Sequence, residues 1–254
     1  MSALLIDAMN LIRRVYEARP HDNIVIEDEV FTSVQQSFSR ALNQHQPSHA
    51  CAVFDSQDNT WRHDLFPQYK ANRSPTPQLL VDALLEFQNS IAKIGVKSLS
   101  IPHYEADDVI ATLATGLSNR GKRVIVLSTD KNFLQLLGEN IVVYDHFKEQ
   151  EYDQNWVEKK YGVKKTQLRD YWALTGDSTL NIKGVPKVGP KSAAKVLEEY
   201  DSLEQLFETE NESVLLSRIK SHKVDAEDAR ELVTLKTDVD LGINLRDLRY
   251  TPVR

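Results

Sequence analysis

In the segment Val124-Ile125-Val126-Leu127-Ser128-Thr129-Asp130, four apolar residues lead through a short polar turn to an acid, a pattern typical of a buried strand and the turn that follows it. Two other segments share this pattern: the apolar residues 3–6 precede Asp7, and residues 50–54 precede Asp55. Short, near-continuous apolar runs are typical of parallel strands that are buried on both faces. The three segments therefore predict neighbouring strands that each end at a carboxylate.

Helical patterns separate these strands along the first 145 residues. Apolar spacing predicts helices over 28–44, 77–94 and 107–117, and further strands over 96–101 and 141–144. This alternation indicates an α/β fold with a mainly parallel central sheet and helices on both faces. After residue 150 helical patterns dominate. We expect an α/β core over 1–150, with a long polar loop at about 56–77, and a helical region over 151–254.

The composition is that of a soluble globular protein, with 41% hydrophobic and 27% charged residues in 254. No apolar run is long enough to span a membrane, and the first residues do not resemble a secretory signal. The single cysteine, Cys51, excludes an intramolecular disulfide and a cysteine-based zinc cluster. We therefore expect a cytoplasmic protein, and a monomer by default.

The net charge of −6 argues at first against a nucleic-acid partner. A hydrolase that gathers carboxylates around a metal ion is nevertheless acidic at one place and can carry basic patches elsewhere. The distribution of the charges is therefore more informative than their sum.

Several acids are expected at one edge of the sheet, because the carboxyl ends of parallel strands share an edge where ligands bind. Asp7, Asp55 and Asp130 follow three predicted strands, and Glu105 and the pair Asp107-Asp108 begin a predicted helix. For any one of them, an ordinary preference for acids at a helix start or a strand end is the simpler interpretation. Five or six acids at one edge favour a functional site.

Clustered carboxylates repel one another unless a cation compensates them. An oxygen-rich site without His or Cys suits Mg²⁺, with Mn²⁺ as a substitute, rather than zinc. The chemistry that fits is metal-assisted hydrolysis of a phosphodiester, in which the ion activates water and neutralises charge on the phosphate.

A glycine-rich turn opens a helix at about 182–200 and reads as a helix-hairpin-helix element. Its glycines allow a close approach to phosphate, and the helix N-terminus after Pro190 favours an anion. The simpler alternative is an ordinary helix start with a solvated lysine face. The lysines that recur at four-residue spacing are Lys183, Lys187, Lys191 and Lys195.

The polar loop carries basic and aromatic residues together, a combination that suits a strand with unpaired bases. Its alternative is a surface loop with ordinary charges. The residues concerned are Trp61, Arg62, His63, Phe66, Tyr69, Lys70 and Arg73.

Taken together, the motifs of the chain resemble those of the flap endonuclease (5′-nuclease) family, which includes the 5′-nuclease domain of bacterial DNA polymerase I. The resemblance covers nearly the whole chain and is strongest to the stand-alone bacterial members. It implies a PIN-like 5′-nuclease fold and Mg²⁺-dependent cleavage of flapped or branched DNA. The matching motifs are Leu5-Ile6-Asp7-Ala8-Met9-Asn10, Phe54-Asp55, Tyr69-Lys70-Ala71-Asn72-Arg73, Glu105-Ala106-Asp107-Asp108, Ser128-Thr129-Asp130-Lys131 and the hairpin.

The resemblance also implies two groups of metal-holding acids. The first group is intact and consists of Asp7, Asp55, Glu105, Asp107 and Asp108. In the second group Asp130 and Asp177 match, whereas Asn132 and Leu180 stand where the family has acids. One ion per chain is therefore expected, with Asp107 as its central ligand. Lys70 and Arg73 are expected to steady the scissile phosphate.

The hairpin of the family binds K⁺ through backbone carbonyls and bridges it to DNA. The matching carbonyl positions are Leu174, Thr175, Lys183, Val185 and Val188, and the expected DNA-binding residues are Lys187, Val188, Gly189, Pro190, Lys191 and Ser192. The chain departs from the family at Lys183, where proline is usual, and at Lys187, where glycine is usual.

Two other functions compete with a nuclease. The incomplete second acid group is compatible with a protein that binds branched DNA but hardly cuts it. A phosphatase with an aspartyl nucleophile usually needs a second acid two residues after the first, and Met9 occupies that place. The flap endonuclease is the preferred hypothesis.

Overall fold

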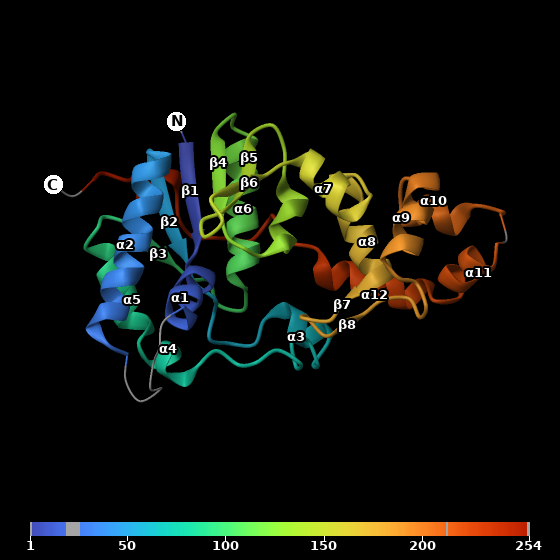
Figure 1. Ribbon diagram of the computed structural model, residues 1–254, viewed down its shortest axis with the longest axis horizontal. Coiled ribbons are helices and arrows are strands. Elements are labelled where there is room, and N and C mark those ends of the chain that lie inside the picture. Colours follow the sequence, from blue (N-terminus) through green and yellow to red (C-terminus); the bar gives the residue numbers. More distant parts are fainter. Residues whose placement is uncertain (1, 19–25, 212, 253–254) are drawn as a thin grey trace. The chain divides into compact units, whose positions relative to one another are not determined.

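The computed structural model describes residues 2–18, 26–211 and 213–252. It divides into two compact units (Figure 1). The first comprises Met1–Thr60, Pro75–Glu151 and Lys236–Arg254, and the second comprises Trp61–Ser74 and Tyr152–Leu235. This division differs from the expected ranges 1–150 and 151–254 in two segments. Residues 61–74 belong with the helical unit, and the C-terminal residues return to the α/β unit.

A six-stranded sheet forms the centre of the first unit, in the order β3-β2-β1-β4-β5-β6. The four pairings from β3 to β5 are parallel, which confirms the predicted mainly parallel sheet. The strand order reverses between β1 and β4, the point where α/β sheets bind ligands. The strands are β1 Ser2–Asp7, β2 His49–Val53, β3 Lys97–Leu99, β4 Arg123–Leu127, β5 Ile141–Asp145 and β6 Gln150–Tyr152.

Helices cover both faces of this sheet, as predicted. On one face, Leu11 of α1, Phe38 of α2 and Phe87 of α5 pack with the strand residues Leu4 and Ile6 in one buried cluster. Helix α6 contacts β1, β2 and β4, and its buried residues lie outside that cluster. The helices of this unit are α1 Ala8–Glu17, α2 Asp28–His45, α4 Gln78–Asp82, α5 Leu84–Ala92 and α6 Ala106–Ser118, with 3-10 turns at Lys131–Leu136 and Leu245–Leu248.

Two local features of this unit differ from the sequence prediction. The single helix expected over 77–94 is divided at Ala83, whose backbone leaves the α region at φ −93° and ψ 9°. Helix α1 was not predicted, because it follows β1 without a connecting loop. Asp7 is both the last strand residue and the N-cap of α1, where its carboxylate accepts a hydrogen bond from the Asn10 amide.

The second unit is mainly helical, as predicted, but it contains one short antiparallel ladder of β7 and β8 that was not foreseen. Its elements are α3 Trp61–Leu65, α7 Gln154–Tyr161, the 3-10 turn Lys165–Gln167, α8 Leu168–Thr175, β7 Gly176–Asp177, β8 Ile182–Lys183, α9 Pro190–Glu199, α10 Leu203–Glu208, α11 Val214–Ser221 and α12 Lys223–Val233. None of the helices in the described part of the chain is long and apolar enough to cross a membrane.

Candidate active site

Three of the predicted acids follow neighbouring parallel strands of the first unit. Asp7 pairs with Val53 and Ile6 with Leu127, so β1, β2 and β4 end at the same level. Burial and repulsion by Asp55 raise the pKa of Asp7 to about 7, and Asp130 adds to the repulsion. The structure therefore brings Asp55 and Asp130 close enough to Asp7 for their charges to oppose its ionisation.

Asp7 is the fixed point of this cluster. Its side chain is buried, and its Oδ2 accepts a hydrogen bond of 2.8 Å from Ser128 Oγ. The Asn10 amide donates to Oδ1 at 3.1 Å. Both bonds favour the charged carboxylate but do not offset the effect of burial and of Asp55 on its pKa. Asp7 is thus held in one orientation while its negative charge remains uncompensated.

Side-chain hydrogen bonds join the ends of β1 and β4. They involve Asn10, Ser128 and Thr129, which were not among the predicted site residues. Asn10 Oδ1 accepts from the Thr129 amide at 3.1 Å, and Asn10 Nδ2 donates to Thr129 Oγ1 at 3.0 Å. Ser128 Oγ accepts from the Asp130 amide at 3.0 Å while donating to Asp7. Their occurrence in the motifs around Asp7 and Asp130 was the available signal.

The acids at the start of α6 lie in two different environments. Asp55 Oδ1 accepts from the Ala106 amide at 2.9 Å, which ties the end of β2 to the helix start beside the buried Glu105. Asp107 is half-buried. Asp108 is fully buried, and its Oδ1 accepts from the Lys236 amide at 2.9 Å. The structure thus gives Asp108 a role in fixing the returning C-terminal segment.

Asp130 begins the 3-10 turn that follows β4. Its Oδ1 accepts a hydrogen bond of 2.7 Å from the Asn132 amide. Asn132, which replaces a family acid, uses its side-chain oxygen to accept from Gln135 Nε2 at 2.8 Å. The carboxamide therefore has a partner inside the turn.

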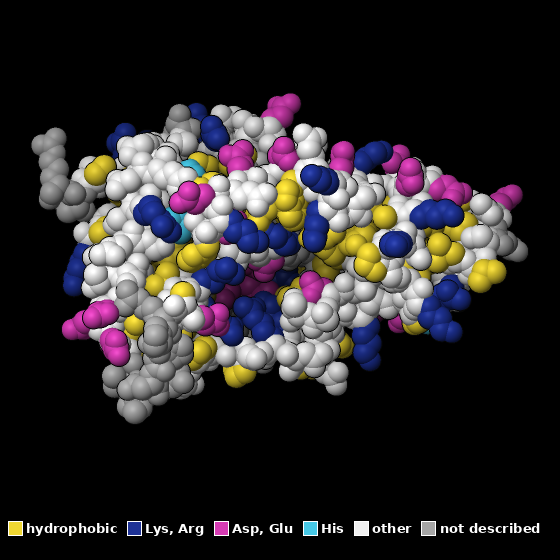
Figure 2. Space-filling view, viewed as in Figure 1, with side chains coloured by type: hydrophobic (Ala, Val, Ile, Leu, Met, Phe, Trp, Pro, Cys, Tyr) yellow, Lys and Arg dark blue, Asp and Glu magenta, His cyan; other side chains and the backbone are white. Residues whose placement is uncertain are grey.

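Lys131 lies beside this acid edge and was not singled out from the sequence. It is half-buried, and burial lowers the pKa of its ammonium group to about 8. The negative charge of Asp145 raises that pKa, whereas the nearby cations Lys148 and Arg14 lower it. Positive charge thus accompanies the carboxylates. Figure 2 likewise shows Lys and Arg interspersed with Asp and Glu on the face that it presents.

The donors of the acid edge suit a hard divalent cation, because they are carboxylate oxygens and the repulsion at Asp7 would be relieved by positive charge. As the described side chains stand, no three of His, Cys, Asp and Glu form a group ready to hold a metal ion. Mg²⁺ keeps several waters and needs only one or two direct carboxylates, so the acid edge need not supply three of them.

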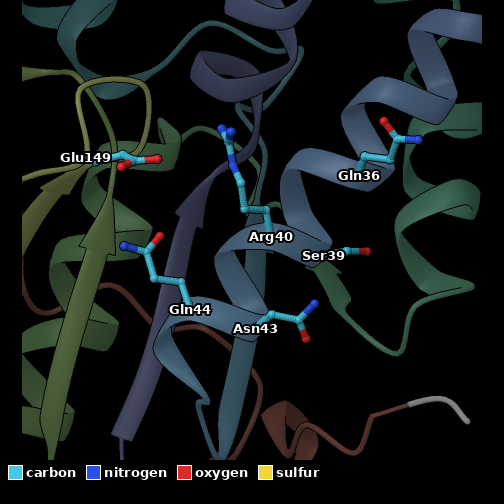
Figure 3. Close-up of a pocket in the computed structure, with 6 residues that line it drawn as sticks. All are labelled: Gln36, Ser39, Arg40, Asn43, Gln44 and Glu149. Atoms are coloured by element: carbon cyan, nitrogen blue, oxygen red, sulfur yellow. The ribbon is translucent and has the colours of Figure 1, made fainter.

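A surface hollow with a polar lining lies elsewhere in this unit, along α2 (Figure 3). Its volume is about 690 Å³, and it contains none of the predicted site residues. Its one arginine, Arg40, donates to the buried His146 Nε2 at 2.8 Å. Burial, with the neighbouring charge of Arg40, lowers the pKa of His146 to about 4. The lining residues are Gln36, Ser39, Arg40, Asn43, Gln44 and Glu149.

In the second unit, the basic and aromatic segment 61–74 is partly internal, which corrects the interpretation of Arg62 as a surface cation. Arg62 is buried and lies over the ring of Trp61. Its Nε donates to the carbonyl of Leu232 at 2.9 Å and its Nη2 to that of Thr234 at 3.1 Å. These carbonyls end α12, where a cation is favourable. Arg62 therefore anchors the segment within its own unit.

The remaining basic residues of this segment are more accessible. Tyr69 is buried, whereas Lys70 is half-buried and Arg73 is exposed. Lys70 has a positive φ of 58°, an uncommon conformation for a residue with a side chain. The structure thus presents Lys70 and Arg73 at the surface from a backbone that is held in a defined turn.

Asp177, the second-unit acid of the predicted metal set, is engaged within its own turn. Its Oδ1 accepts from the amide of Thr179 at 2.8 Å, from Thr179 Oγ1 at 2.6 Å and from the amide of Leu180 at 3.2 Å. Three donors thus converge on one oxygen of this carboxylate.

The hairpin between α8 and α9 requires glycine at two places. A Cβ at Gly176 would lie 2.4 Å from the Gly184 nitrogen, and a Cβ at Gly184 would lie 2.4 Å from the Leu174 carbonyl. Lys187, where the family usually has glycine, adopts a φ of 64°. Gly189 then caps α9, and Pro190 occupies its first turn.

The predicted K⁺ carbonyls lie around this hairpin, and two of them already accept a backbone hydrogen bond. The Val185 amide donates to Leu174 at 2.9 Å, and the Val188 amide donates to Val185 at 3.0 Å. A carbonyl has a second lone pair, so both remain capable of binding a cation. Lys183, Lys187 and Lys191 are exposed, as are Gly189 and Pro190, and Ser192 is half-buried.

Two models of known protein families together match almost the whole chain. Residues 2–162 match the model of the 5'-3' exonuclease N-terminal resolvase-like domain, and residues 163–254 match the 5'-3' exonuclease C-terminal SAM fold. Proteins called flap endonuclease Xni from Psychromonas ingrahamii and Colwellia psychrerythraea are 43% and 41% identical. Each comparison covers 98% of this chain, and 97% and 91% of the respective relative.

Among solved structures, a flap endonuclease of bacteriophage T5, in a pseudo-enzyme-product complex with DNA and metal ions, has a similar fold. The TM-score is 0.75 at 18% identity, over 92% of this chain and 89% of that one. The sequence-based resemblance is thus confirmed at the level of family and fold. The chain belongs to the 5'-3' exonuclease family, a family of nucleases.

Proposed function

We propose that the protein is a divalent-metal-dependent flap endonuclease that hydrolyses phosphodiester bonds in branched DNA. The observation that carries this proposal is the meeting of Asp7, Asp55 and Asp130 at the ends of three adjacent parallel strands. The names of the curated relatives and the DNA and metal ions of the T5 neighbour support it.

The metal ligands of this proposal come from the first unit. The ion would be held directly or through water by Asp7, Asp55, Glu105, Asp107 and Asp130. Asp107 would be its central ligand. When bound, Mg²⁺ or Mn²⁺ supplies an activated water and neutralises charge on the scissile phosphate. Ser128 and Asn10 keep the Asp7 carboxylate oriented toward that edge. Asp108 would support the site indirectly, because its carboxylate accepts a hydrogen bond from the Lys236 amide and so ties α6 to the C-terminal segment.

We infer that one ion suffices. In the second acid group, Asn132 and Leu180 have no carboxylate. One carboxylate oxygen of Asp177 accepts hydrogen bonds from its own turn. A single ion can provide both water activation and charge neutralisation.

The second unit would grip the DNA without reading its sequence. The lysines and the helix N-terminus after Gly189 suit the phosphates of a duplex, with contacts from Lys187, Val188, Gly189, Pro190, Lys191 and Ser192. Carbonyls of Leu174, Thr175, Lys183, Val185 and Val188 would bind K⁺ between the hairpin and a phosphate. Lys70 and Arg73 would contact the phosphate that is cut. We propose that the protein acts as a cytoplasmic monomer.

Cleavage of a labelled 5′ flap substrate tests this function. The unaltered protein should cut in Mg²⁺ and lose activity in EDTA. Asp107→Ala should lower kcat at least about 10³-fold, because it removes the central ligand. Asp82→Ala is the control, since Asp82 is an exposed acid of the same unit bonded to Gln78. Tight flap binding without product in Mg²⁺ and in Mn²⁺ would instead indicate a flap-binding protein.

A further inference from the structure

The segment that carries Lys70 and Arg73 is bonded to the turn that joins β7 to β8 within the second unit. The Lys70 amide donates to the carbonyl of Leu180 at 2.9 Å. Asn181 Nδ2 donates to the carbonyl of Gln68 at 2.8 Å, and Asn181 Oδ1 accepts from Asn72 Nδ2 at 2.6 Å. Three hydrogen bonds therefore connect two segments more than a hundred residues apart.

The turn is itself held in a defined conformation. Asp177 Oδ1 binds the amides of Thr179 and Leu180, and Asn181 has a φ of 57°. Asn is among the residues that tolerate this left-handed region best. Asp177 therefore presents the Leu180 carbonyl and the Asn181 carboxamide to the segment that bears Lys70.

The side chain at position 180 takes no part in this arrangement, because Leu180 contributes only its carbonyl and amide. The turn can thus serve the Lys70 segment without an acid at this position. The substitution that weakens the predicted second metal group leaves these bonds intact.

We propose that Asn181 is a positioning residue for DNA cleavage, which sets the orientation of Lys70 and Arg73 toward the phosphate of the substrate. This rests on the proposed nuclease function. Asn181 touches neither DNA nor metal in this proposal. It holds the backbone before Lys70 through the Gln68 carbonyl and the side chain of Asn72 after it, so that the ammonium group approaches the phosphate from a constrained turn.

A double-mutant cycle tests whether Asn181 acts through Lys70. Asn181→Gly removes both carboxamide bonds and keeps the positive φ accessible. It should lower kcat about 10-fold with less than a twofold change in KM, because phosphate contacts made in the transition state are lost. In a Lys70→Ala background the same change should cost less than about twofold, since coupled residues are not additive.

Three comparisons keep this test interpretable. Asn155→Ala, an exposed asparagine of α7 in the same unit, is the control and should leave kcat unchanged. Asn72→Ala should reproduce part of the effect of Asn181→Gly. An equal loss from Asn181→Gly in both backgrounds, or none in either, would overturn the proposal. Failure of the unaltered protein to cut any flap would instead contradict the proposed function.

Hydrogen exchange provides a readout that does not depend on cleavage. The Lys70 amide is bonded to Leu180 and should exchange slowly in the unaltered protein. Asn181→Gly should accelerate it at least about tenfold, while the α8 amides keep their protection, because opening is local. Unchanged exchange at Lys70 would show that Asn181 does not hold this segment, whatever the activity.

Discussion

Asp7 and Asp177 are both strand-end aspartates of the predicted metal set, but their carboxylates are in opposite states. Asp7 is buried next to other acids, and its pKa is raised to about 7. Asp177 is half-exposed, and one of its oxygens receives three hydrogen bonds from its own turn. Neighbouring acids raise the pKa of Asp7, so a bound cation would stabilise its charged form, whereas the hydrogen bonds of Asp177 are explained by its own turn. Position in a family motif does not distinguish the two cases.

Replacement of each aspartate by its amide tests the difference between Asp7 and Asp177 most directly. Asp7→Asn should lower flap cleavage at least about 100-fold, because a charged ligand is lost. Asp177→Asn should change cleavage by less than about threefold, because an amide oxygen can still accept the turn's hydrogen bonds. Steady-state kinetics in Mg²⁺ measures both. Comparable losses from the two variants would mean that Asp177 also holds an ion.

The effect of Mg²⁺ on the melting temperature is a second test of the difference between Asp7 and Asp177. The folded pKa of Asp7 is raised, so its charge destabilises the fold above the unfolded pKa, and stability rises as pH falls from about 7 toward 4. Mg²⁺ should therefore raise the melting temperature more at pH 8 than at pH 5.5. Asp7→Asn should melt higher than the unaltered protein without metal and lose most of the Mg²⁺ effect. Calorimetry with EDTA as reference decides this.

The hairpin allows a smaller test in the second unit. Lys187 adopts a left-handed backbone that costs a non-glycine residue about 1 kcal/mol, so Lys187→Gly should raise the free energy of unfolding by a similar amount. Lys191→Gly, in the first turn of α9, is the matched charge control and should destabilise. Both variants should weaken DNA binding through the lost cation. Denaturant unfolding that ranks the two equally would contradict the backbone argument.

A further effect, confined to acid pH, concerns His146, whose pKa of about 4 lies below that of an unfolded histidine. Its contribution to stability is complete above pH 6.5 and is lost as pH falls toward 4, because the unfolded chain binds the proton first. This slope opposes that of Asp7. His146→Gln should flatten the decrease of the melting temperature between pH 6.5 and 4.5. An unchanged pH profile would exclude this contribution.

The sheet and the acid edge were predictable because they depend on local pattern. Apolar runs ending at Asp7, Asp55 and Asp130 identify parallel strands, and topology alone brings their ends together. The burial of the Arg62 side chain was not predictable, since the carbonyls that it binds, those of Leu232 and Thr234, lie some 170 residues away in the sequence. The different environments of Asp107 and Asp108 were not predictable for the same reason, because Lys236, which donates to Asp108, lies 128 residues away.

The return of the C-terminal segment to the first unit has a consequence for biosynthesis. Asp108 receives its hydrogen bond from Lys236, and the Tyr250 amide donates to the Ser48 carbonyl beside β2. A ribosome releases these residues long after the sheet strands, although domains generally fold as units during synthesis. We expect the nascent α/β unit to be incompletely stabilised until the C-terminal segment has left the exit tunnel. Until then Asp108 lacks its hydrogen bond from Lys236, and Ser48 lacks its hydrogen bond from Tyr250. Stalled nascent chains in which a C-terminal linker has carried this segment out of the tunnel should differ in protease resistance of the first unit from chains that end before it.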